Sequence, residues 1–142
     1  MAQLATETST PDERPVVTNR NPAVDGFLGE LDHPLAADVR SLRLAILSLP
    51  VGVGEQIKWR APSFTYDGVD RVTFNLRPTD RIQLVLHRGA KVRQDTEAFT
   101  FTDDDGLVEW ITPDRGTVSV MPAELASRRP ALLELVARWV VA

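Results

Sequence analysis

The chain has 142 residues, of which 43% are hydrophobic and 25% charged; this balance is typical of one soluble globular domain and excludes a chain that is disordered throughout. The 16 Lys and Arg residues against 20 Asp and Glu residues give a net charge of -4, which argues against non-specific nucleic-acid binding because such binding needs a basic surface. The sequence contains no cysteine, so disulfides, thiolate metal sites and cysteine catalysis are excluded.

The first 20 residues differ in composition from the rest of the chain. Residues 1–20 are rich in Thr, Pro and charged side chains and show no apolar period, so we expect a disordered N-terminal arm followed by one domain over residues 21–142. The arm lacks the apolar segment of a secretion signal, and no apolar run approaches the ~20 residues that span a bilayer. We therefore expect a cytoplasmic protein that does not associate with membranes.

Two helices are predicted before residue 50. Asn21-Pro22 is a typical helix start because Pro fits the first helical turn, and the apolar residues that follow recur at helical spacing. A second helix begins after Pro34, and Pro50 ends it. Its apolar positions step by four, three, four and three residues, which predicts a buried seam of Leu35, Val39, Leu42, Ile46 and Leu49.

After Gly54 the apolar period changes from helical to alternating, which predicts strands. The predicted strands cover residues 56–61, 63–66, 72–76 and 82–87, followed by a hairpin of residues 108–112 and 117–121. Asp67-Gly68 is a typical hairpin turn. A last helical region begins near Pro122 and is renewed at Pro130, where a new apolar stripe follows.

The order of elements is helices, then five or six strands joined by short turns, then a helix. Because short turns join antiparallel neighbours, we predict an α+β fold of two layers, in which the N-terminal helices and the C-terminal helix cover one face of a mainly antiparallel sheet. Leu42 and Leu84 should then lie in one core. Trp110 and Trp139 also lie in apolar patterns, and we interpret both as core residues.

Three segments carry a resemblance to a known family. Residues 55–64 hold a Lys-Trp pair followed by Pro and Phe, a later strand ends in His87-Arg88-Gly89-Ala90, and the helix before them has Leu42-Arg43 and a closing Pro50. On these residues the chain resembles the YdhG-like bacterial domains of unknown function over roughly residues 27–140. The resemblance implies an α-β-α fold similar to frataxin, and some members of the family are described as iron chaperones.

Iron handling is therefore one alternative function, with iron as the cofactor. The resemblance to frataxin implies an acidic ridge along the first helix and the sheet edge. Here the carboxylates of the first helices are interleaved with Arg40 and Arg43; they are Asp25, Glu30, Asp32 and Asp38. The acidic run of residues 103–105 fails the EF-hand pattern because Phe101 would occupy the first ligand position. We predict no metal site and no cofactor.

The first predicted strand carries two closely spaced cations. Alternation over residues 56–61 places Lys58 and Arg60 on one face and Trp59 on the other, which a covered sheet would bury. Two cations on one rigid strand can bind a carboxylate or a phosphate. The alternative interpretation is that both cations are solvated and that Trp59 is only a core residue.

Two further residues complete the candidate site. His87 points away from the apolar face of its strand, and a kink at Pro62 lets Phe64 fold over as an apolar wall. We therefore predict one site for a small anionic ligand, formed by Lys58, Trp59, Arg60, Phe64 and His87. A structural or surface role for His87 is the alternative.

The sequence predicts no catalytic residue. The second histidine is His33, no serine lies in a nucleophile-elbow motif, and residues 52–55 precede a strand instead of a helix, so they lack the geometry of a phosphate loop. The leading hypothesis is a small binding module whose protein partners are unknown. Frataxin-like iron handling and an enzyme of unknown reaction are the alternatives.

Overall fold

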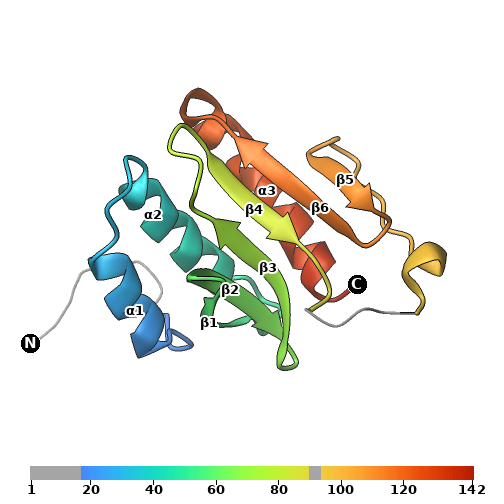
Figure 1. Ribbon diagram of the computed structural model, residues 1–142, viewed down its shortest axis with the longest axis horizontal. Coiled ribbons are helices and arrows are strands. Elements are labelled where there is room, and N and C mark those ends of the chain that lie inside the picture. Colours follow the sequence, from blue (N-terminus) through green and yellow to red (C-terminus); the bar gives the residue numbers. More distant parts are fainter. Residues whose placement is uncertain (1–16, 90–93) are drawn as a thin grey trace, which may run out of the picture.

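The computed structural model describes residues 17–89 and 94–142, so most of the predicted N-terminal arm lies outside the described residues. The helices and strands follow in the order α1 (Pro22–Gly29), α2 (Ala36–Leu47), β1 (Gly54–Lys58), β2 (Ala61–Tyr66), β3 (Val69–Asn75), β4 (Ile82–Leu86), β5 (Val108–Thr112), β6 (Arg115–Val120) and α3 (Leu125–Val140) (Figure 1). Short 3-10 turns lie at Thr96–Ala98 and Pro122–Glu124.

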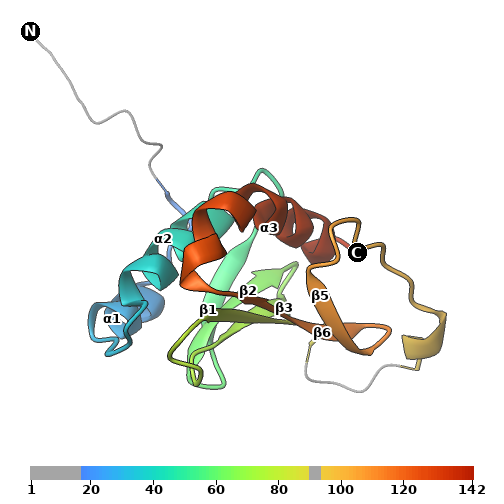
Figure 2. The same cartoon turned by 90° about the horizontal axis from the view of Figure 1, so that it is seen from above.

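The six strands form one open sheet in the order β1-β2-β3-β4-β6-β5, and every neighbouring pair is antiparallel. Figure 2 shows that α1, α2 and α3 lie on one side of this sheet. The α+β prediction, with an antiparallel sheet and a C-terminal helix, is therefore confirmed. No helix of the described residues lies on the opposite face of the sheet, and we call it the open face.

The core lies between the helices and the sheet. Leu42 and Leu84 both belong to it, as the helical seam and the strand alternation predict, and Trp139 of α3 is fully buried there. Burial of such apolar side chains is the main term that stabilises a domain of this size. Among the described residues, no helix is long and apolar enough to cross a membrane.

The packed part of the chain begins before the predicted boundary at residue 21. Val17 is partly buried against the core, and the side-chain amide of Asn19 donates to the carbonyls of Leu47 at 3.1 Å and Val53 at 2.6 Å. These bonds satisfy two carbonyls of the connection between α2 and β1. The polar composition of residues 17–20 did not indicate that they pack against the domain.

A buried ion pair joins the helical layer to the sheet. The Arg43 guanidinium donates to both carboxylate oxygens of Glu55, at 2.9 and 2.5 Å, and lies 2.7 Å from Asp25. The backbone N–H of Asn21 donates to the same Glu55 carboxylate at 2.7 Å. Glu55 thus lies on the helix side of β1 although it is charged, because its negative charge is paired there.

The strand predicted over residues 56–61 is interrupted. Lys58 pairs with Ala61 across a two-residue turn, and the turn residues Trp59 and Arg60 both have positive φ, 54° and 59°. The prediction that Trp59 points into the core is wrong, because a turn residue does not follow strand alternation; the residue is 49% exposed.

A β-bulge changes the facing of β3. Phe64 pairs with Val72, but the next residue of β2, Thr65, pairs with Asp70, so β3 holds one extra residue, Arg71. Regular alternation from Val72 would place the Asp70 side chain on the apolar face of the sheet. Because of the bulge, it lies on the open face instead. Arg71 turns toward the other side and donates to the Trp139 carbonyl of α3 at 3.3 Å.

Trp110 is not a core residue. It lies on β5, the last strand of the sheet, and is 37% exposed. Its ring still packs against two buried or half-buried aromatics, with centroids 5.8 Å from Trp139 and 6.2 Å from Phe101. The alternating pattern predicted the strand correctly, but it could not show that the strand forms an edge.

Candidate functional site

Four polar side chains form a continuous hydrogen-bonded chain on the open face. The Ser63 hydroxyl donates to the Asp70 carboxylate at 2.7 Å and lies 2.7 Å from the Thr73 hydroxyl. Thr73 in turn lies 2.9 Å from Nε2 of His87. All four residues are buried, although they belong to the open face.

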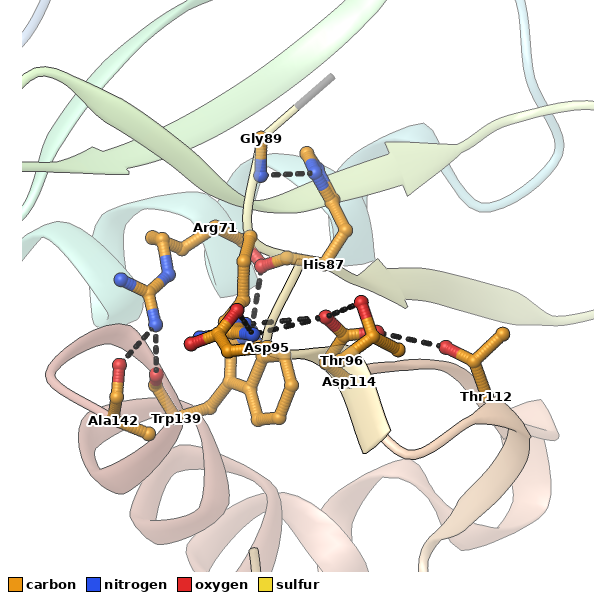
Figure 3. A network of polar contacts seen from close by, with 10 residues as sticks. Arg71, His87, Gly89, Asp95, Thr96, Thr112, Asp114, Trp139 and Ala142 are labelled. Atoms are coloured by element: carbon orange, nitrogen blue, oxygen red, sulfur yellow. Dashed lines mark hydrogen bonds and ion pairs between the residues drawn. The ribbon is translucent and has the colours of Figure 1, made fainter. Parts of the chain in front are cut away.

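The direction of this chain follows from its ends. The backbone N–H of Gly89 donates to Nδ1 of His87 at 3.2 Å (Figure 3), so Nδ1 carries no proton and Nε2–H donates to Thr73. Thr73 then donates to Ser63, and Ser63 donates to Asp70. Every donor is used, and the chain ends on a carboxylate that can only accept.

The charges along the chain are fixed by burial and by partners. Burial lowers the pKa of His87 to about 4; the positive charges of Arg115 and Lys58 act in the same direction, and the Asp70 carboxylate opposes them. Burial alone would raise the pKa of Asp70, but hydrogen bonds from Gln56 and Ser63 and the charge of Lys58 outweigh it and lower that pKa. At neutral pH the ring is uncharged and Asp70 is an anion.

Trp59 covers the histidine end of the chain. Its ring centroid lies 4.9 Å from that of His87, with the two planes tilted by 38°. Lys58 Nζ lies 5.7 Å from the Trp59 ring centroid, and the Arg115 guanidinium carbon lies 5.6 Å from it. Lys58 also lies 3.5 Å from Asp70. Two cations therefore lie over one half-exposed indole.

The structure brings together three of the five predicted site residues: Lys58, Trp59 and His87. Arg60 is exposed at the adjacent turn. Phe64 takes no part, because it lies on the other face of the sheet, where its ring is fully buried at 5.8 Å from Phe74. The Pro62 kink does not turn it outward, since Pro62 continues the β1–β2 pairing opposite Ile57.

Sequence reasoning missed the other contributors to this site. Arg115 reaches it from β6, which lies far along the chain, and Asp70 reaches it only because of the bulge. Ser63 and Thr73 face each other across β2 and β3, but a regular register from the Asp67-Gly68 turn would pair Ser63 with Val72, so this pairing also depends on the bulge.

A second polar cluster lies near the backbone of His87 (Figure 3). The Arg88 guanidinium bonds Asp114 at 3.1 Å and Asp95 at 2.9 Å, and its carbon lies 4.0 Å from the Phe99 ring centroid. The Trp139 indole N–H donates to the His87 carbonyl at 3.1 Å. His87 and Arg88, the two residues that follow β4, thus anchor two different networks.

Metal ligation finds no support in the part of the chain that the structure describes. No group of three or more His, Asp or Glu side chains there could hold an ion. In the acidic turn, one oxygen of Asp103 accepts the backbone N–H of Val108 at 2.7 Å, which closes the turn.

No protein-family model, no curated protein sequence and no solved structure matches this chain. The candidate site therefore has to be interpreted from its own geometry.

Proposed function

We propose that the open-face site around Trp59 binds a small organic anion. The observation that carries the proposal is a pair of cations close to one half-exposed ring. They are Lys58, the last residue of β1, and Arg115, the first residue of β6. Within residues 17–89 and 94–142, no carboxylate lies within salt-bridge distance of Arg115. A guanidinium without a carboxylate partner among the described residues is suited to a carboxylate or phosphate ligand.

The balance of charge supports an anion. Asp70 offsets Lys58, His87 is neutral, and the charge of Arg115 is left over, so the site carries a net positive charge within a protein of net charge -4. A local positive site on an acidic chain attracts anions selectively, because the rest of the surface repels them.

Binding, instead of catalysis, is proposed because of the state of His87. Both of its ring nitrogens have hydrogen-bond partners and the residue is 1% exposed, so neither nitrogen faces a ligand as a general base. Membership of the YdhG-like family, a frataxin-like fold and iron handling stay predictions, and no described residue group favours the iron alternative.

Two-dimensional NMR with benzoate and inorganic phosphate as probes tests the proposal. The indole N–H signal of Trp59, identified by its loss in Trp59→Phe, should shift on titration. Lys58→Met and Arg115→Met should each weaken binding roughly ten- to a hundredfold, because each removes one charge-assisted bond. Arg128→Met removes an exposed cation of α3 and should leave binding unchanged. Equal weakening in all three variants would mean non-specific attraction and would overturn the proposal.

A further inference from the structure

We infer that the anion bound at this site is carried on a flat aromatic ring that stacks on Trp59; the inference rests on the proposed function and names the class of its ligand. The relevant ligands are aromatic carboxylates or aromatic phosphate esters. Four observations on the described residues support this class of ligand: the backbone of the turn, the support under the indole, its exposure, and the position of the cations.

The turn holds a large aromatic residue where the backbone favours a small one. Both turn residues lie in the left-handed region, where Asn-Gly is the usual choice for a two-residue hairpin turn. Trp59 and Arg60 each bear the strain of a positive φ. Strain of this kind is retained mainly at functional sites, because elsewhere it only destabilises the fold.

The indole rests against His87 and is half exposed. The His87 ring lies against it at 4.9 Å, and His87 itself is fixed by the Gly89 N–H and by Thr73. Two hydrogen bonds on a buried ring leave it little freedom to rotate, so the indole rests on a rigid surface. With 49% of Trp59 exposed, part of the indole remains available for a second ring. A platform that is already in place costs a ligand little ordering entropy.

The cations are placed for a charge attached to that second ring. Lys58 and Arg115 lie at nearly equal distances from the Trp59 centroid, 5.7 and 5.6 Å. Both cations lie over the indole, so an aromatic ring packed against its exposed part would hold a carboxylate or phosphate close to them. An aliphatic anion can use the same charges, but it lacks the quadrupole interaction that makes offset ring pairs favourable beyond their buried area.

Two probes of equal charge and similar size separate the contribution of the aromatic ring to binding from that of the charge. Benzoate is planar and aromatic, whereas cyclohexanecarboxylate is neither. On the wild-type protein, benzoate should bind about two- to tenfold more tightly, which is the size of an aromatic pair contribution. Dissociation constants are read from the backbone amide signals of Gly89 and Arg115, which remain in every Trp59 variant.

Four variants test which residue provides the preference. Trp59→Leu should bring the ratio of the two dissociation constants to about one, and Trp59→Tyr should retain a preference for benzoate. Trp110→Leu removes the other half-exposed tryptophan, on β5, and should leave the ratio unchanged. Lys58→Met should weaken both probes by the same factor. Folding of each variant is checked by the backbone amide signals of the core residues Leu84 and Val72.

The outcomes separate the preference for an aromatic ring from anion binding itself. Equal binding of both probes by the wild type, still dependent on Lys58, overturns the aromatic class and leaves the anion site standing. A preference for benzoate that survives Trp59→Leu assigns the stacking surface to another residue and also overturns the inference. Binding of neither probe overturns both the inference and the proposed function.

Discussion

Arg88 and Arg115 both lie beside an aromatic ring, but their surroundings differ. Arg88 lies 4.0 Å from the Phe99 ring, is buried, and is paired with the carboxylates of Asp114 and Asp95. Arg115 lies 5.6 Å from the Trp59 ring, is half-buried, and has no carboxylate partner among the described residues. The side chains are the same, so only the neighbourhood separates their roles.

The contrast shows how a structural charge differs from a charge available to a ligand. Burial alone would raise the pKa of Asp114, but hydrogen bonds from Thr112, Arg88 and Thr96 outweigh it and lower that pKa, so the network around Arg88 is complete. A complete network holds segments together and offers nothing to a ligand. Arg115 pairs with no carboxylate among the described residues, and Asp70, the anion of the open-face chain, is already held by Ser63, Gln56 and Lys58.

The largest effect is expected when the complete network is broken. Arg88→Met leaves the buried Asp114 carboxylate without its cation, which should lower the free energy of unfolding by about 3–5 kcal/mol. Urea denaturation of wild type and variant measures the change. Asp95→Asn is the control; its carboxylate is largely exposed, so the cost should stay below about 1 kcal/mol. A loss under 1 kcal/mol for Arg88→Met would contradict the structural role.

The next effect concerns pH and the histidine on the open face. His87 has a pKa of about 4 in the folded protein against 6.5 in the unfolded chain, so between these values the unfolded state binds more protons. The free energy of unfolding should therefore fall by about 2–3 kcal/mol as the pH drops from 6.5 to 4. Urea midpoints measured across this range follow the change.

His87→Gln isolates this contribution because it removes the titrating ring and keeps an N–H donor toward Thr73. The fall between pH 6.5 and 4 should be smaller in this variant. Asp70 and Asp114, whose pKa values are lowered from 3.8, lose their stabilising charge only at still lower pH, so they do not account for the difference. An identical slope in wild type and variant would show that the histidine is not held neutral by the fold.

Much of the fold was predictable because the apolar residues of each helix or strand recur at a single spacing, helical or alternating. The seam through Leu42 and Ile46 and the alternation of Ile82, Leu84 and Leu86 all lie in the core as expected. Asp67-Gly68 forms the predicted turn because both residues tolerate a positive φ. The binary pattern is informative wherever one face of an element is buried and the other is not.

The candidate site was predictable only in part, because it lies where local rules are broken. Trp59-Arg60 has no sequence signature of a turn. The predicted strand therefore continued through both residues, and its alternation placed the indole on the core side of the sheet. The extra residue at Arg71 reverses the facing of Asp70, and no pattern of apolar residues marks a bulge in advance. Arg115 is absent from the prediction because its approach depends on strand order, not on sequence distance.

A smaller effect is expected from relieving the strained turn without touching the ring. Arg60 has a φ of 59° and an exposed side chain, so Arg60→Gly should raise the free energy of unfolding by about 1 kcal/mol. Arg77→Gly is the control at an exposed position without a positive φ and should not stabilise. Benzoate affinity should stay close to that of wild type; a tenfold loss would show that Arg60 belongs to the binding site.

The smallest effect on stability is expected at Arg115, and it completes the comparison with Arg88. Arg115→Met breaks no ion pair among the described residues and retains most of the side-chain length, so the free energy of unfolding should change by less than about 0.5 kcal/mol. The same variant should raise the pKa of His87 above about 4, because Arg115 is one of the positive charges that lower it. An NMR titration of the His87 ring measures this shift, and Arg128→Met should not produce it. A destabilisation as large as that of Arg88→Met would mean that Arg115 is structural, and the contrast between a complete and an incomplete network would be lost.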